Sequence, residues 1–202
     1  MMSEWDDAQE FERAWWGSCV NTFAEETKQL TYAYKMGLTA TSDGGRWPVY
    51  DLGGARVLDI GGGPTSILLR SINIGPASMV VDPCRYPDWV RERYAAAGVA
   101  MLQRRAEDLS SPLQYDEVWL YNVLQHTDDP ELIAKNARRS APVIRVFEWI
   151  DFPASEGHPQ ALTEAGLNEW FDVTGTTEHL NENFCQGRAW FGSVKTTVSV
   201  GF

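Results

Sequence analysis

The chain has 202 residues, 44% of them hydrophobic, and a formal net charge of -11 at pH 7. Length and apolar content fit a single domain with a substantial core, while the charge disfavours nucleic acid and anionic lipid as partners because both would be repelled. Three cysteines without a CxxC pair indicate neither a disulfide framework nor a zinc site, and we predict no metal. The acidic first residues differ from a basic signal peptide, and no apolar run approaches the roughly 20 residues that span a membrane. We therefore expect a cytoplasmic protein.

Residues 4 to 37 predict two helices. The second has a capping residue, Asn21 or Thr22, with Glu25 three residues after Thr22 as in a capping box, and Gly37 stops it. Its positions at helical spacing are Phe23, Thr27, Leu30 and Tyr34. The first helix is less sharply bounded.

A loop covers residues 39 to 52, and beyond it strands alternate with helices. Five strands are predicted, at Arg56–Ile60, Ser78–Val81, Val99–Leu102, Glu117–Leu124 and Pro142–Phe147. Helices are predicted to start at Ile67, at Pro87, at Pro130 behind the capping residue Asp129, and behind the capping residue Thr163. The chain between Leu109 and the fourth strand is too short for a full helix. Residues 173 to 202 predict two more strands, a closing antiparallel pair.

This alternation predicts an α/β three-layer sandwich with a mostly parallel seven-stranded sheet, whose last strand is antiparallel. Residues 1–52 would form an N-terminal helical cap or lid, part of the same domain, and residues 53–202 the core. Ligands of such sheets bind beyond the carboxyl ends of the strands, so the chemistry should lie in the loops there.

The stretch from Val57 to Ser66 reads V-L-D-I-G-G-G-P-T-S. An apolar run that breaks at an acid into three glycines is typical of a buried strand that turns sharply beneath a ligand. A dinucleotide loop would have glycine at Ser66, and a P-loop would continue into Gly-Lys-Ser/Thr; neither pattern is present. A nucleotide-like ligand without phosphate fits this loop better.

Four stretches in order resemble the class I S-adenosylmethionine-dependent methyltransferases over about residues 50 to 150. Val57 to Gly63 resembles motif I, and Asp82 closes the second strand where the family has an acid. Residues 106 to 108, Ala-Glu-Asp, look like the loop that holds the adenine. The stretch from Tyr115 to Val118, with residues 122 to 126, is similar to motif IV and its continuation.

The resemblance implies a Rossmann-like methyltransferase core with S-adenosylmethionine as cofactor. It implies that Asp82 accepts hydrogen bonds from the ribose hydroxyls. The other cofactor-binding residues that it implies are Asp59, Gly61, Gly62, Gly63, Glu107, Asp108 and Asn122. Plainer roles stay open for two of them, since Asp59 can serve only to fix the turn and Asp108 to cap a loop.

Methyl transfer is an in-line displacement that depends mainly on positioning, and it needs a base only if the nucleophile must lose a proton. His126, after the fourth strand, and His158, after the fifth, are the candidate catalytic bases. Glu148 with Asp151 is a further choice. For His126, hydrogen bonding to loop backbone is an equally good interpretation.

The acceptor is predicted to be a small molecule, methylated on oxygen or nitrogen. Amino-group nucleic-acid methyltransferases have Asn/Asp-Pro-Pro-aromatic after the fourth strand, whereas this chain has Asn-Val-Leu-Gln at residues 122 to 125. The Pro-Cys pair of cytosine carbon-5 enzymes occurs only at Pro83-Cys84, after the second strand. The alternatives are a cofactor-binding or regulatory protein without turnover, a protein, RNA or modified-base methyltransferase, and, least favoured, an NAD-dependent dehydrogenase. The pattern does not indicate an oligomeric state.

Overall fold

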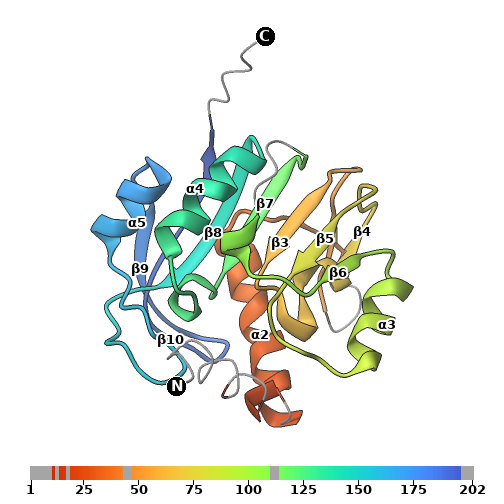
Figure 1. Ribbon diagram of the computed structural model, residues 1–202, viewed down its shortest axis with the longest axis horizontal. Helices are drawn as coiled ribbons and strands as arrows, with labels where there is room; N and C mark the ends of the chain where they lie inside the picture. The colour runs from red at the N-terminus through yellow and green to blue at the C-terminus, as the bar shows by residue number, and fades with distance from the viewer. Residues whose placement is uncertain (1–10, 12–13, 17–18, 43–46, 110–113, 197–202) are drawn as a thin grey trace.

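The computed structural model describes residues 11, 14–16, 19–42, 47–109 and 114–196. Seven strands form the main sheet: β3 (Val57–Ile60), β5 (Met79–Val81), β6 (Ala100–Leu102), β7 (Glu117–Tyr121), β8 (Val143–Trp149), β9 (Thr176–Glu182) and β10 (Cys185–Lys195). Their order across the sheet is β6-β5-β3-β7-β8-β10-β9 (Figure 1). Neighbours pair in parallel except at β10, which is antiparallel to both β8 and β9. The predicted sheet is confirmed.

One face of the sheet is covered by α2 (Cys19–Lys35) and α3 (Asp88–Ala96). Tyr32 of α2 and Tyr94 of α3 belong to the same buried cluster as Trp119 of β7. Burial of such large rings contributes much of the hydrophobic stabilisation of a core. This cluster joins the first helical layer to the sheet.

The other face is covered by α4 (Pro130–Ser140) and α5 (Glu164–Phe171), which lie side by side in Figure 1. Ile133 of α4 and Phe171 of α5 share a second buried cluster with Leu120 of β7. Leu120 follows Trp119 directly, and successive side chains of a strand point to opposite faces. The helices on both faces therefore make the predicted three layers.

The helix ends follow the predicted signals. The Asp129 side chain accepts a hydrogen bond from the Leu132 N–H (2.9 Å) at the start of α4, and Thr163 accepts one from the Gly166 N–H (3.1 Å) in α5. These side chains satisfy backbone donors that a first helical turn leaves without a partner. None of the helices in the described part of the chain has the length and apolar content of a membrane span.

The helix predicted to start at Ile67, after the glycine turn, does not form, and that prediction was wrong. The chain forms two 3-10 turns instead, Gly63–Thr65 and Ile67–Arg70. Ser66 separates them with an extended backbone (ψ 146°), and its hydroxyl accepts a hydrogen bond from the Leu68 N–H at 3.0 Å. Serine competes in this way with helical hydrogen bonding, so the helix does not continue through it.

The loop predicted for residues 39 to 52 contains two short strands. β1 (Ala40–Ser42) pairs with β2 (Val49–Asp51), and β2 pairs in parallel with β4 (Ser71–Ile72). These strands form a separate small sheet. β4 directly follows the second 3-10 turn. The chain that was predicted to continue as a helix therefore supplies a strand of the small sheet instead.

The predicted helix at residues 21 to 37 forms, but two details were wrong. Asn21 and Thr22 lie inside α2, which already includes Cys19. The buried face carries Glu25, Gln29, Tyr32 and Met36, whereas Phe23 and Tyr34 are exposed. Most of the predicted first helix lies outside the described residues, apart from residue 11 and residues 14–16, which are helical.

Candidate functional site

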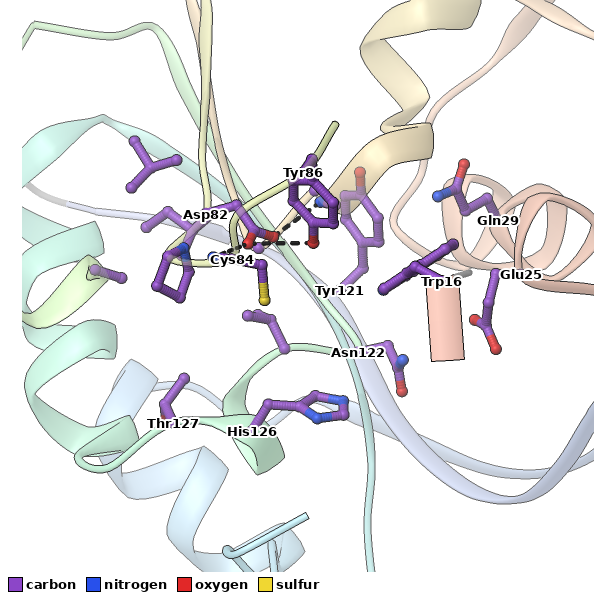
Figure 2. Close-up of a pocket in the computed structure, with 18 of the residues that line it drawn as sticks. Trp16, Glu25, Gln29, Asp82, Cys84, Tyr86, Tyr121, Asn122, His126 and Thr127 are labelled. Atoms are coloured by element: carbon purple, nitrogen blue, oxygen red, sulfur yellow. Dashed lines mark hydrogen bonds between the residues drawn. The ribbon is translucent and has the colours of Figure 1, made fainter. Parts of the chain in front are cut away.

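A pocket opens at the carboxyl edge of the sheet, around the turn after β3 (Figure 2). Its empty space is about 810 Å³, with the open mouth included. We call it the glycine-turn pocket. The residues that line it come from α2, from the N-terminal helical segment, and from the ends of β3, β5, β6 and β7 with the four loops that follow them: Trp16, Glu25, Gln29, Tyr32, Ile60, Gly61, Gly62, Gly63, Val81, Asp82, Pro83, Cys84, Tyr86, Ala106, Glu107, Tyr121, Asn122, Val123, His126 and Thr127.

The turn itself requires glycine at two positions for different reasons. Gly61 has φ +73°, and a Cβ there would lie 2.1 Å from Cγ2 of Val123. At Gly62 a Cβ would lie 2.6 Å from a carboxylate oxygen of Asp59. Only glycine combines the left-handed conformation with so close an approach, so the backbone forms the wall of the pocket.

Asp59 lies beneath this turn and is not among the residues that line the pocket. Its Oδ2 accepts hydrogen bonds from the hydroxyls of Ser66 and Tyr121, the latter at 2.6 Å. Its Oδ1 has no hydrogen-bond partner in the described part of the chain. Burial raises the pKa of Asp59 to about 7, against the opposing effect of the two hydroxyls. This geometry corresponds to the plainer of its two predicted roles, fixing the turn.

Asp82 follows β5 and lines the pocket. One carboxylate oxygen accepts the Gly63 N–H at 3.1 Å, and the other accepts the Cys84 N–H at 2.9 Å and the Tyr86 hydroxyl at 3.3 Å. Figure 2 shows the carboxylate beside Cys84 and Tyr86. The side chain is thus held rigidly at the edge of the pocket, next to the glycine turn.

The two acids after β6 have different surroundings. Glu107 lines the pocket and accepts hydrogen bonds from the Arg105 guanidinium (3.3 Å) and the Asp128 N–H (3.2 Å). Asp108 is exposed and is not among the lining residues. Both belong to the 3-10 turn Ala106–Asp108, whose tight geometry turns adjacent side chains in different directions.

The fourth strand was predicted to reach Leu124, but β7 ends at Tyr121. The next residue, Asn122, has φ +53°, which a strand does not allow. Its Oδ1 accepts a hydrogen bond from Gln125 Nε2 at 2.8 Å. The early end of the strand brings Asn122 and His126 into the wall of the pocket.

His126 and His158 lie together, with ring centroids 4.6 Å apart. Nδ1 of His126 is 2.7 Å from the carbonyl oxygen of Gly157, and because that oxygen only accepts, the proton is assigned to Nδ1. Burial lowers the pKa of each histidine to about 4, and the neighbouring His126 contributes to the shift at His158. Both rings are therefore neutral at pH 7.

A second cavity adjoins the first, with about 1230 Å³ of empty space including its mouth. We call it the aromatic chamber. Four residues line both cavities and define their junction: Trp16, Glu25, Asn122 and His126. The remaining lining residues are Phe11, Trp15, Lys28, Gln125, Trp149, Phe152, Pro153, Ser155, His158, Phe184 and Gln186.

Three solved structures have similar folds over nearly the whole chain. The 1,6-didemethyltoxoflavin-N1-methyltransferase of Burkholderia thailandensis is 14% identical, with a TM-score of 0.64, over 95% of this chain and 87% of that one. The magnesium protoporphyrin IX methyltransferase of Synechocystis PCC 6803 with bound SAM is 14% identical, with a TM-score of 0.61, over 97% and 99%. A possible histamine N-methyltransferase of Thermotoga maritima is 13% identical, with a TM-score of 0.59, over 96% and 100%.

This chain has the class I methyltransferase fold. No family model and no curated protein sequence matches it, so the likeness is one of structure. The methyltransferase fold accounts for the position of the glycine-turn pocket, since ligands of open α/β sheets bind beyond the carboxyl ends of the strands.

The sequence did not predict that α2 lines the glycine-turn pocket. Glu25 and Gln29 are buried and line the glycine-turn pocket, and Gln29 Nε2 donates to the Thr65 hydroxyl at 3.2 Å. Glu25 had been interpreted as part of a capping box. Two polar residues four apart, on the same helical face as Tyr32, interrupt what would otherwise be an apolar stripe, and this signal could have identified them.

Glu148, a further candidate base, is completely buried and lines neither cavity. Its Oε1 accepts the N–H groups of Val123 and Leu124, each at 3.1 Å. Burial raises the pKa of Glu148 to about 8. The side chain therefore supports the loop that carries Asn122 and His126. Asp151, its predicted companion, pairs instead with Arg188 at 2.6 Å.

Proposed function

We propose that the protein is an S-adenosylmethionine-dependent methyltransferase that acts on oxygen or nitrogen of a small molecule. The observation that carries this proposal is the chemistry of the glycine-turn pocket. Its described lining contains three carboxylates, those of Glu25, Asp82 and Glu107, and neither lysine nor arginine. Glu25 is paired with Lys28 and Glu107 with Arg105, so a pyrophosphate would find no unpaired cationic side chain in this lining, whereas S-adenosylmethionine has no phosphate and carries an ammonium and a sulfonium group.

Each part of this cofactor has a suitable partner. Asp82 would accept hydrogen bonds from the ribose hydroxyls, Glu107 would border the adenine, and the backbone of the turn at residues 61 to 63 would face the methionine part. Asn122 would border the same ligand at the junction. Asp59 would act from beneath, by holding the turn through Ser66.

When bound, the cofactor supplies an electrophilic methyl group attached to sulfur. The protein's contribution is to hold an acceptor in line with that group, which is the main source of rate in such displacements. His126 lies at the junction with its Nδ1 proton directed to Gly157. Its Nε2, which is 3.5 Å from Nε2 of Gln125, would accept a hydrogen bond from an acceptor hydroxyl or amine that displaces this long contact. A pKa of about 4 makes His126 a weak base, so positioning outweighs proton removal, and His158 supports the ring of His126.

The N-terminal cap, residues 1–52, would complete the site rather than form a separate unit, because α2 supplies Glu25 and Gln29. Cys185 is a buried free thiol, which agrees with the proposal that the protein works in the cytoplasm.

Calorimetric titration with S-adenosylmethionine and S-adenosylhomocysteine tests the proposal, with NADH and ATP as controls. We expect saturable binding of the first two and none of the controls. No binding of either adenosyl compound at millimolar concentration would overturn the proposed function. Binding without methyl transfer to any acceptor would instead favour a regulatory protein.

A further inference from the structure

The aromatic chamber is the second compartment of the site, and the inference drawn from it rests on the proposed function. The junction residues Trp16, Glu25, Asn122 and His126 line both cavities. A methyl group leaving a cofactor in the glycine-turn pocket toward this junction would enter the aromatic chamber. The acceptor therefore has to fit the walls of the chamber.

Those walls are made of aromatic rings from separate parts of the chain. Trp15 comes from the N-terminal helical segment, Trp149 and Phe152 from the end of β8 and the loop after it, and Phe184 from the turn between β9 and β10. The rings of Trp149 and Phe152 meet edge to face at 6.4 Å. Aromatic rings that line one cavity from several sides offer both ring faces and ring edges to an aromatic ligand.

Several of these rings are exposed although they are large and apolar. The exposed fraction is 46% for Phe152, 59% for Phe184 and 38% for Trp15. Single exposed apolar side chains are common on protein surfaces, but a group of them around one cavity marks a binding site. Covering these rings with a ligand would remove their apolar surface from water.

The charged side chains of the chamber are paired with each other. Lys28 and Glu25 are the charged side chains in the described lining, and they form an ion pair at 2.7 Å. Gln125 donates to Asn122 at 2.8 Å. His126 and His158 are uncharged at pH 7 because burial lowers the pKa of each to about 4. The chamber thus carries no excess charge to select a charged acceptor.

We propose that the methyl acceptor is a neutral, flat aromatic molecule that carries a hydroxyl or amine group. Its rings lie between Trp149, Phe152 and Phe184, and its nucleophile points to the junction. The acceptor oxygen or nitrogen forms the new bond to the methyl carbon with its lone pair. The carbon–sulfur bond breaks, its electron pair stays on the sulfur of S-adenosylhomocysteine, and the acceptor proton passes to water. A sugar fits less well, because its many hydroxyls would find no hydrogen-bond partners on the aromatic rings.

Three small probes that all carry hydroxyl groups test this proposal on the full chain: 2-naphthol, its saturated analogue decahydro-2-naphthol, and methyl glucoside. Calorimetry is done with saturating S-adenosylhomocysteine and again without it. We expect 2-naphthol to bind more tightly than both other probes. Phe152→Ala and Phe184→Ala should each weaken 2-naphthol binding about three- to tenfold, the value of one aromatic contact.

Trp89→Ala is the matched control, because Trp89 is also an exposed ring (54%) but lies on α3 and outside the described lining of both cavities. This variant should bind 2-naphthol like the wild type. Binding of decahydro-2-naphthol or methyl glucoside as tight as that of 2-naphthol would overturn the proposal, as would equal effects of Phe184→Ala and Trp89→Ala. Failure of S-adenosylhomocysteine to bind would overturn the proposed function instead, since the titration without it reports on the chamber alone.

Discussion

The glycine-turn pocket and the aromatic chamber share four residues, yet the two cavities are built in different ways. The first is lined largely by short loops after β3, β5, β6 and β7, and the glycine turn in it is held by hydrogen bonds such as those of Asp82. The second is made of large side chains from the N-terminal segment, from the loop after β8 and from the β9–β10 turn. A turn fixed by its backbone suits one unchanging ligand, whereas side chains can differ between proteins of the same fold and so set the acceptor.

If the glycine turn is rigid, adding a methyl group to it should lower the free energy of unfolding. Gly61→Ala places a Cβ 2.1 Å from Val123 at φ +73°, and we expect a loss of about 2 to 4 kcal/mol in the free energy of unfolding from strain and overpacking. Gly53→Ala is the control, because φ there is +57° but no atom lies within 4 Å, so roughly 1 kcal/mol should be lost. Urea unfolding measures both. Equal losses would show that the turn at Gly61 can relax.

Glu148 supports the loop that carries Asn122 and His126, and its titration should make the free energy of unfolding depend on pH. Its folded pKa of about 8 lies above the ordinary glutamate value of 4.5, so the folded state holds a proton that the unfolded state releases between these values. The stabilising effect of that proton is complete below pH about 4.5 and is lost as pH rises through 8.

Glu148→Gln keeps the shape of the side chain and removes its titration. The difference in unfolding free energy between wild type and this variant should change by up to roughly 4 kcal/mol from pH 4.5 to pH 8.5, at 1.36 kcal/mol per pKa unit. Urea unfolding across this range measures it. A constant difference would contradict a protonated Glu148.

Asp82 should affect the glycine-turn pocket without affecting the chamber. Asp82→Ala is expected to weaken S-adenosylmethionine binding by ~1 to 3 kcal/mol, as for a lost hydrogen bond to a charged group. Calorimetry of the cofactor and of 2-naphthol on the same variant separates the two cavities. Phe184→Ala is the reciprocal variant, with cofactor binding retained. Binding of the cofactor by Asp82→Ala as tight as that of the wild type would contradict the proposal that Asp82 binds the ribose hydroxyls.

The smallest expected effect concerns the junction. His126 and His158 each have a pKa of about 4 because partial burial disfavours the charged ring, so their ring proton NMR signals should stay constant from pH 5.5 to pH 8. His126→Gln and His158→Gln assign the signals, and a free imidazole added to the sample serves as the titrating reference. A midpoint near 6.5 for either ring would mean that the junction is open to water.

Most of the fold followed from local patterns. The capping residues Asp129 and Thr163 act on neighbouring residues only, and the structure places both as predicted. The helix expected after the glycine turn failed for two reasons: the Ser66 hydroxyl accepts a hydrogen bond from the nearby Leu68 N–H, and the chain after it pairs with the distant strand β2. Local periodicity does not contain such partners.

By itself the sequence determined the sheet, the glycine turn and the acid at Asp82, because each depends on residues close together in the chain or at the end of a strand. Only the tertiary structure decided that Asp59 and Glu148 are buried supports, and that α2 turns Glu25 and Gln29 toward the pocket. The aromatic chamber was equally beyond reach, since Trp15, Trp149 and Phe184 are far apart in the chain. Packing of the whole domain, and no local preference, brings their rings to one cavity.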